Sequence, residues 1–315
     1  MGVHGGASPA RRDDRVEGSL PTVVSRLPGW VADHTPASFR HATAVFDGAH
    51  AMDVLTFQQH VFDAYQTVLR EIDDGAPNHL VRFWAFIPGI HDDLGAGLDR
   101  YMAFNAGRYA AFSSHYRRPT AFDRSVPTAS AVGVEGDLFV LHCLASAHVG
   151  RPVENPRQVS AYHYSRRFGP MPPCFARATL LQTDDGQPLL LVGGTASITG
   201  EESRHLGNVH QQACETFRNL GNVLAAAAGV TLAENASVAE LRSLLADFVD
   251  IRVYYTREAD SVSIANVLSA TFPATCRIEM LQASLCRSEL LVEIEGIARL
   301  RCHVRAVDSG RVLGR

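Results

Sequence analysis

The sequence predicts an α/β (α+β) protein built from two similar halves, each a mixed β-sheet with helices packed on one face. The first observation is an order of helix, strand, helix and two further strands. The second is the return of that order later in the chain, with Pro127 and Pro273, 146 residues apart, each preceding a strand pair. The third is the composition: 46% of the 315 residues are hydrophobic, enough for real cores in about two domains.

The first half opens with an amphipathic helix. Apolar residues recur with a 3.6-residue period from Asp53 to Ile72, and Asp53 stands in the N-cap position. The elements expected next are a strand within the aromatic and branched run His79–Ile90, a helix from about Leu98 to Phe112, and strands at Ala129–Val134 and Leu138–Ala145. The tripeptide between these last two strands, Glu135-Gly136-Asp137, is typical of a hairpin turn.

The second half repeats this order. The elements expected are a helix Ser203–Ala228 closed by Gly229, a strand Phe248–Tyr255, a helix from about Ala259 to Phe272, and strands Cys276–Ser284 and Leu290–Leu300 around Arg287-Ser288-Glu289. Two more strands are expected before it, within Gly169–Leu180 and Leu189–Gly200. An internal duplication explains the repeat most economically, although many α/β units share such an order.

Domain boundaries follow from composition. Residues 1–20 are polar, rich in Arg and Asp, and lack the apolar core of a signal peptide, so we expect a disordered N-terminus. A first domain is expected over residues 21–150, a polar linker with two prolines over 151–160, and a second domain over 161–315. No stretch has 18 consecutive apolar residues, so we expect a cytoplasmic protein without a membrane partner.

The charge balance argues against nucleic acid as a partner. The chain has 29 basic and 33 acidic residues, a net charge of −4, which leaves no basic surplus for a phosphate backbone. All 29 basic residues are arginine, so Schiff-base, pyridoxal-phosphate, phosphate-loop and kinase mechanisms that need a lysine are excluded. A bound anion is therefore held by guanidinium groups, hydroxyls or backbone amides.

Neither the cysteines nor the histidines have metal-ligand spacing. The six cysteines include no CxxC pair and are expected to be reduced thiols, and the 14 histidines include no HExxH motif. We therefore expect no metal and no cofactor.

Three segments of the second half carry a resemblance to a known family. Residues 169–300 resemble the YjgF-like (reactive-intermediate deaminase, chorismate-mutase-like) fold, above all in LVEIEGIA at Leu291–Ala298. More specifically, AYHYSRRFGPMPPCFARAT (161–179), GTASITGEES (194–203) and LCRSELLVEIEG (285–296) resemble the chorismatase family, and the likeness extends over about residues 40–300. This resemblance implies a degenerate YjgF-like N-terminal domain, a better-preserved catalytic one, chorismate as substrate and a homotrimer or a monomer as assembly.

At one position the sequence departs from the imine deaminases that share this fold. In imine deaminases of this fold an arginine follows the Pro-Ala before the hairpin and binds the substrate carboxylate, whereas here Thr275 follows Pro273-Ala274. A 2-imino acid deaminase therefore lacks its anchor. A non-catalytic ligand-binding protein is the other alternative.

Chorismate cleavage needs an acid that is protonated near neutral pH. Release of pyruvate requires protonation of the enol-ether methylene, and a carboxylic acid whose pKa is raised by burial or by a second carboxylate can supply that proton. Glu293 and Glu295 stand two apart in an apolar strand, so their side chains share one face. The alternation alone favours a solvated face. The resemblance implies instead that Glu293 is the proton donor and Glu295 its supporting partner.

The resemblance and the cost of burying a charge also select binding residues. Arg177 stands among apolar residues, where an arginine is costly unless it is paired or faces a pocket, and Tyr162, Arg166 and Arg287 are further candidates for holding the two carboxylates. Cys286 and Ala196 are candidate walls of the pocket that selects the product. In the family, a cysteine near the acid goes with rearrangement to 3-hydroxybenzoate, and small residues go with hydrolysis to a dihydroxycyclohexadiene carboxylate. The first of these products is expected.

Overall fold

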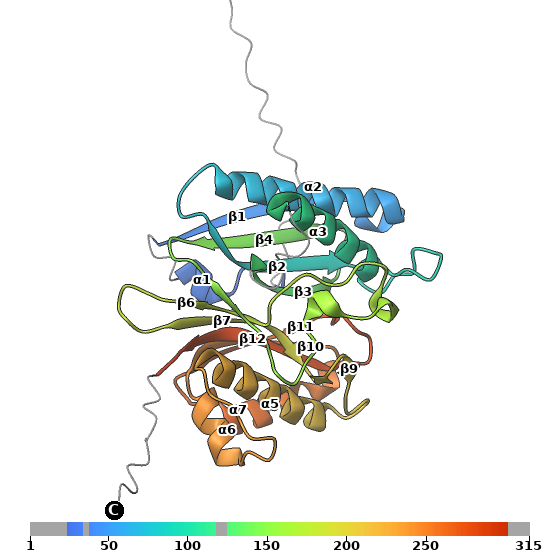
Figure 1. Ribbon diagram of the computed structural model, residues 1–315. Coiled ribbons are helices and arrows are strands. Elements are labelled where there is room, and N and C mark those ends of the chain that lie inside the picture. The colour runs from blue at the N-terminus through green and yellow to red at the C-terminus, as the bar shows by residue number, and fades with distance from the viewer. Residues whose placement is uncertain (1–23, 34–37, 118–124, 302–315) are drawn as a thin grey trace, which may run out of the picture.

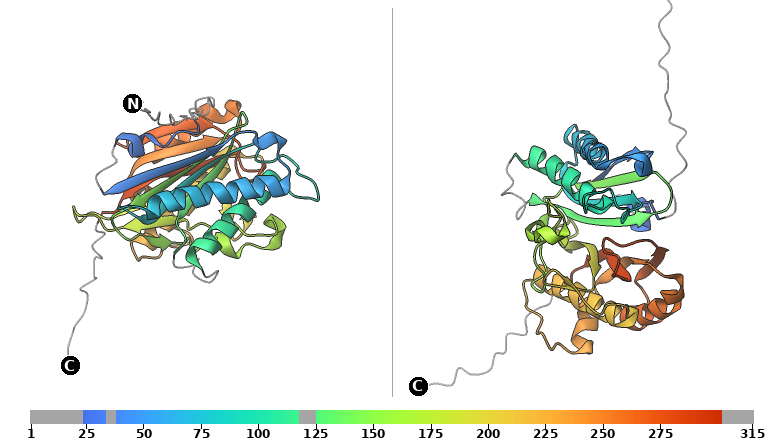
Figure 2. Two further views of the ribbon diagram at one scale, coloured as in Figure 1. Left: turned by 90° about the horizontal axis from the view of Figure 1, so that it is seen from above. Right: turned by 90° about the vertical axis from the view of Figure 1, so that its right-hand side faces the viewer.

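Two mixed sheets face each other in the middle of the computed structural model, and helices cover the outer side of each sheet (Figure 1). The structure describes residues 24–33, 38–117 and 125–301. Helices α2 (Val54–Asp73) and α3 (Arg100–Tyr116) cover the first sheet. Helices α5 (Val209–Ala227), α6 (Val238–Leu245) and α7 (Ser261–Thr271) cover the second. The predicted fold class is confirmed, as the two further views in Figure 2 also show.

The first sheet has the strand order β1 (Phe39–Phe46), β4 (Phe139–Ser146), β2 (His79–Pro88), β3 (Thr128–Val134). Strand β2 is antiparallel to β4 and parallel to β3, so it lies between the two strands expected to form a hairpin. The hairpin prediction around Gly136 is therefore wrong. Because β2 is buried over most of its length, its backbone groups need a partner strand on both sides, and the short β3–β4 connection passes across its end.

The second sheet repeats this pattern and extends it. Its order is β11 (Arg277–Gln282), β10 (Phe248–Tyr255), β12 (Val292–Arg299), β7 (Leu189–Ala196), β6 (Ala178–Leu181), β5 (Arg151–Val153). Strand β10 separates β11 from β12, so the second predicted hairpin is also wrong. The series β7–β12–β10–β11 has the same order and directions as β1–β4–β2–β3, which is the arrangement that an internal duplication predicts.

Helix starts follow from their capping residues. The Asp53 carboxylate accepts the Thr56 N–H at 2.8 Å, so the predicted start of α2 is confirmed. Helix α5 begins six residues later than predicted, behind an Asn208 cap, because Glu202–Ser203 forms β9 and pairs with β8 (Ile198–Thr199). Strand β6 begins at Ala178 rather than Gly169, since the prolines in between cannot donate to a strand ladder.

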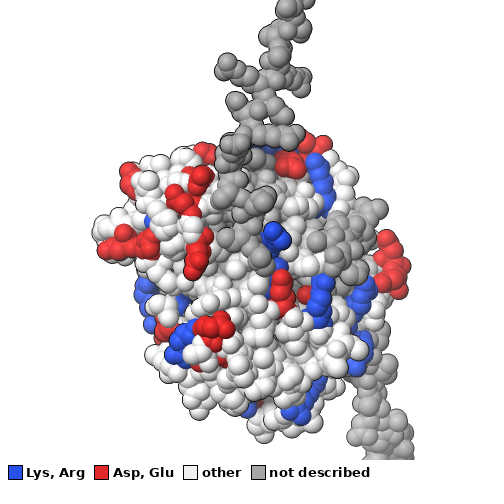
Figure 3. Space-filling model, turned by 180° about the vertical axis from the view of Figure 1, so that it is seen from behind, with Lys and Arg blue, Asp and Glu red and all other residues white. Residues whose placement is uncertain are grey.

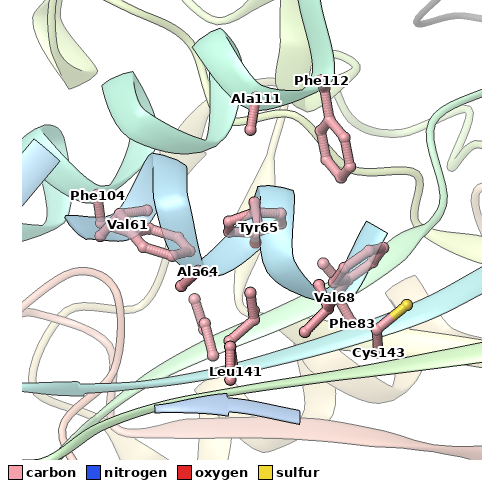
Figure 4. Close-up of a cluster of buried hydrophobic side chains, with 14 of the residues drawn as sticks. Val61, Ala64, Tyr65, Val68, Phe83, Phe104, Ala111, Phe112, Leu141 and Cys143 are labelled. Carbon is pink, nitrogen blue, oxygen red and sulfur yellow. The ribbon is translucent and has the colours of Figure 1, made fainter. Parts of the chain in front are cut away.

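Three hydrophobic layers hold these elements together. Between the first sheet and its helices, apolar faces of α2 and α3 pack on β2 and β4, as Figure 4 shows for Tyr65, Phe112, Phe83 and Leu141. A second layer lies under α5 and α7. The third fills the space between the two sheets and includes Trp84, against which Trp30 of α1 (Gly29–Asp33) packs at 6.2 Å between ring centroids. The halves are thus joined by a largely apolar core that encloses a buried ion pair between Arg82 and Glu295.

The regions outside the two repeats add little regular structure. Arg151–Val153 of the expected linker forms β5, the edge strand of the second sheet. The remaining short elements are 3-10 turns at Ala49–Ala51, Ala161–His163, Arg166–Phe168 and Glu258–Asp260. The expected disordered segment 1–20 lies outside the described residues.

Surface charge and helix composition were compared with what nucleic-acid and membrane partners require. On the face shown in Figure 3, acidic and basic side chains lie in small separate groups on a largely uncharged surface. Among the helices of the described residues, none combines the length and apolarity needed to span a bilayer. The five cysteines of that part of the chain are free thiols.

Candidate active site

A cavity of about 230 Å³ opens between the two halves. The first half lines it with residues of α3 and β3, among them Tyr101, Met102, Arg108 and Ser130. The second half contributes Tyr164, Arg177, Gly194, Ala196, Cys286, Arg287 and Glu293. Both halves of one chain are therefore needed to form this cavity.

Glu293 is a buried acid at the wall of the cavity. Its neighbours on β12, Val292 and Ile294, pack toward the helices, so the alternation turns Glu293 and Glu295 toward the first half. Glu293 is 4% exposed, which excludes the solvated face that the alternation alone favours. Burial, and next the negative charge of Glu295, raise the pKa of Glu293 from its ordinary 4.5 to about 8. Glu293 is therefore mostly protonated at neutral pH.

Glu295 is the carboxylate of the pair. Its Oε2 accepts from Arg82 Nη2 at 2.7 Å, and its Oε1 accepts from Trp84 Nε1 at 2.9 Å and from the Tyr254 hydroxyl at 3.2 Å. Glu293 receives no hydrogen bond from any described residue. These three donors, one of them cationic, favour a negative charge on Glu295, and that charge in turn favours the protonated form of its neighbour Glu293.

Gly194 makes room for the Glu293 carboxyl. A Cβ at this position would lie 2.1 Å from Glu293 Oε1 and 3.2 Å from Ser130 Oγ. Any side chain on β7 at this point would displace the acid. The requirement for glycine here arises from close approach, not from an unusual backbone conformation.

Three arginines face the cavity without a salt bridge to any described residue, although the half-buried Glu154 carboxyl lies near enough to Arg177 to interact with it electrostatically. Arg177 donates to the Val159 carbonyl at 2.9 Å and to the Tyr164 hydroxyl at 2.8 Å, and Arg108 donates to Asn105 Oδ1 at 2.7 Å. Arg287 donates to the Glu201 carbonyl at 2.8 Å and lies over the Phe168 ring. Within the described ranges, these three form no salt bridge, and the Nε atoms of Arg108 and Arg177 are buried without a hydrogen-bond partner. Such cations suit a small anion with more than one negative group.

Four further residues expected at the site differ in where they lie. Cys286 and Ala196 line the cavity beside Glu293, and burial raises the pKa of the Cys286 thiol to about 12, so Cys286 is neutral and serves as a wall. Tyr162 and Arg166 are not among the lining residues; Tyr162 packs on the core of the first half, and Arg166 is exposed. The 3-10 turns at 161–163 and 166–168 present Tyr164 and Arg167 to the cavity instead.

Sequence reasoning missed the contributions of the first half. Arg108 is 1% exposed within an apolar stretch of α3, and Arg82 is 2% exposed within β2. The argument that selected Arg177, the cost of an arginine among apolar neighbours, applies equally to both. That signal also selects Arg100 and Arg252, which lie outside the cavity lining, so burial cost alone finds Arg82 and Arg108 but does not separate them from structural arginines.

The raised pKa of Glu293 predicts a stability change. Between the ordinary pKa of 4.5 and the folded value of about 8, the unfolded chain releases a proton that the folded protein keeps, so this residue makes folding less favourable as pH rises through that window. Glu293→Gln is expected to raise the free energy of unfolding at pH 7 by about 1–3 kcal/mol. Urea unfolding at pH 4 and pH 7 tests this: the gain is expected to vanish at pH 4, and an equal gain at both values contradicts it.

Fold and cavity together define an α/β protein of two similar halves, in which a buried carboxyl lines a cavity that also contains arginine side chains. The family model described as chorismatase FkbO/Hyg5-like, N-terminal, matches residues 33–145. The chain is 33% identical over 244 residues to a 3-hydroxybenzoate synthase of Streptomyces hygroscopicus, an alignment that spans 74% of this chain and 67% of that protein. The chain belongs to the chorismatase family.

Two further comparisons agree. A chorismatase of Streptomyces rapamycinicus is 30% identical over 256 residues, which span 79% of this chain and 71% of that protein. The crystal structure of a chorismatase superposes with a TM-score of 0.69 at 27% identity, covering 82% of this chain and 74% of the other. The resemblance found in the sequence is confirmed.

Proposed function

We propose that the protein cleaves chorismate to pyruvate and 3-hydroxybenzoate, with Glu293 as the acid. The observation that carries this proposal is a buried carboxyl of raised pKa at the wall of a cavity that also holds three arginines, none of which forms a salt bridge to a described residue. The names of the two curated relatives support the substrate. Because both halves of one chain line the cavity, we further propose that the monomer is the active unit.

The proposed reaction starts with orientation of the dianion. Arg108, Arg177 and Arg287 hold the two carboxylates, which brings the enolpyruvyl methylene to Glu293. Glu293 transfers its proton to that carbon, a C–H bond forms, and positive charge develops on the ether carbon and oxygen. The ring hydroxyl displaces the ether oxygen, pyruvate leaves, and the hydroxyl proton returns to Glu293. The ring then aromatises by an internal rearrangement, so no water is consumed overall.

Incubation of the purified protein with chorismate tests the proposal. Chromatography is expected to show pyruvate and 3-hydroxybenzoate in equal amounts. The value of kcat/KM is expected to fall as pH rises through about 8, because ionised Glu293 has no proton to give. Absence of pyruvate, with turnover of a 2-imino acid in its place, would identify a deaminase instead. Binding of chorismate without turnover would identify a non-catalytic binding protein.

The product depends on whether water reaches the activated ether. Cys286 and Ala196 wall the cavity near Glu293, and a filled wall leaves the ring hydroxyl as the nucleophile. Cys286→Ala is expected to admit water and to direct part of the product, at least about a tenth, to the dihydroxycyclohexadiene carboxylate. The measurement is the ratio of the two products by chromatography, with Cys276→Ala, outside the cavity, as control. An unchanged ratio would remove Cys286 from product selection.

A further inference from the structure

Ser130, on β3 of the first half, has a hydroxyl proton that no described residue receives. Its Oγ accepts a hydrogen bond from Arg82 Nη2 at 2.7 Å and a second from the Gly194 N–H at 2.8 Å. Ser130 is 5% exposed and lines the cavity together with Glu293. Since a serine oxygen has two lone pairs and both are used, Ser130 can take part in further hydrogen bonding only as a donor.

Glu293 Oε1 lies on the same side of Gly194 as this hydroxyl. The ideal Cβ point of Gly194 is 2.1 Å from Glu293 Oε1 and 3.2 Å from Ser130 Oγ, so the two oxygens flank one small space. While Glu293 is protonated it needs no donor. Once it has released its proton it is a buried carboxylate, and the Ser130 hydroxyl on the other side of this space is the candidate donor to it.

We propose that Ser130 is a positioning residue that donates a hydrogen bond to the Glu293 carboxylate formed after proton transfer, and that Arg82 holds Ser130 in the orientation to do so. This inference rests on the proposed function. It gives the first half a part in the chemistry: Arg82 on β2 fixes both the Glu295 carboxylate and the Ser130 oxygen through the same nitrogen. A hydrogen bond to a charged acceptor is among the stronger hydrogen bonds in proteins.

Other groups around Glu293 also set its protonation. Glu295 neighbours it on β12, and Arg82 reaches it from β2. Arg177 precedes β6, Cys286 and Arg287 precede β12, and Tyr101 and Arg108 belong to α3. Ser130→Ala leaves these residues unchanged but removes one acceptor of Arg82, whereas Ser130→Thr keeps it. A change in the titration of Glu293 that occurs in Ser130→Ala and not in Ser130→Thr therefore reports the loss of the hydroxyl together with its contact to Arg82.

The test compares Ser130→Ala with Ser130→Thr, which keeps the hydroxyl. Ser130→Ala is expected to lower kcat for pyruvate release about tenfold to a hundredfold with little change in KM, because the hydrogen bond forms only after proton transfer begins. The alkaline limb of kcat/KM is expected to move upward by about one pH unit, since the anion loses a donor. Ser130→Thr is expected to keep the wild-type limb. Ser146→Ala, a buried serine in β4 outside the cavity lining, is the control for loss of a buried hydroxyl.

The outcomes separate this inference from the proposed function. A wild-type protein that releases no pyruvate overturns the proposed function. If the wild type releases pyruvate but the alkaline limb of Ser130→Ala lies at the wild-type pH, the role of Ser130 is overturned and the proposed function is not. This holds whatever loss in kcat Ser130→Ala shows. If Ser130→Ala does not fold, the alkaline limbs of kcat/KM of Ser130→Thr and Ser130→Cys are compared instead. Because a thiol is a weaker donor than a hydroxyl, only the limb of Ser130→Cys is expected to move to higher pH. Equal limbs in the two variants contradict the proposal.

Discussion

Glu293→Gln is expected to lower the rate of pyruvate release from chorismate by about 10³-fold or more, while the protein stays folded and binds 3-hydroxybenzoate. A positioned general acid contributes about 10²–10⁴-fold, and glutamine has the shape of the protonated acid without its proton. Steady-state kinetics at pH 6.5 measures the loss, and calorimetric titration with 3-hydroxybenzoate checks binding.

Glu234→Gln, which makes the same chemical change outside the cavity lining, is the matched control and is expected to keep the wild-type rate. Near-native turnover by Glu293→Gln would show that another group protonates the methylene. If Glu293→Gln loses both turnover and its fold, the rate of Glu293→Asp is measured instead. That variant keeps the acid but withdraws it by one methylene, and a residual rate above that of Glu293→Gln is expected.

Glu295→Gln is expected to have two large effects. It leaves the Arg82 guanidinium, 2% exposed, without an anion, which is expected to cost about 3–5 kcal/mol in the free energy of unfolding. It also removes the negative charge that helps to raise the pKa of Glu293, so the alkaline limb of kcat/KM is expected to move to lower pH. Urea unfolding and a pH–rate profile measure the two effects separately.

Asp185→Asn is the control for the stability effect, because its ion pair with Arg299 lies at the surface and is expected to contribute less than about 1 kcal/mol. A Glu295→Gln protein as stable as the wild type would show that groups other than Glu295 stabilise the buried charge of Arg82. A limb that moves to higher pH would contradict the assignment of the anion to Glu295.

Local features of the fold could be predicted because they depend on nearby residues. The period from Asp53 to Ile72 and its cap determine α2, and the branched run Phe248–Tyr255 gives β10 with the predicted bounds. The strand neighbours could not be predicted in this way. A tight turn such as Glu135-Gly136-Asp137 fits a hairpin equally well, and only the demand of β2 for two neighbours decides against it.

In the candidate site, too, local features could be predicted and long-range contacts could not. The period of two in β12 places Glu293 and Glu295 on one face, and this was predicted from their spacing. What makes one of them an acid and the other an anion is Arg82, which contacts Glu295 across 213 residues of chain. The segment that contains the candidates Tyr162 and Arg166 forms 3-10 turns, and these place Tyr164 and Arg167 at the cavity instead.

The two halves have diverged into complementary roles. Strand β4 carries His142 where β12 carries a carboxylate, and no Asp or Glu occurs in β4. The first half supplies Arg82 and Trp84, which donate hydrogen bonds to Glu295, and Ser130 and Arg108, which line the cavity with Glu293. A degenerate repeat is therefore retained as half of the binding cavity.

The central claim is that Glu293 carries a proton near neutral pH, and infrared difference spectroscopy tests it most directly. The carbonyl stretch of a protonated carboxylic acid is expected in the wild type at pH 6.5, lost on titration with a midpoint near pH 8, and missing from Glu293→Gln. A wild-type spectrum without that band at pH 6.5, or a midpoint near the ordinary value of 4.5, would contradict the account.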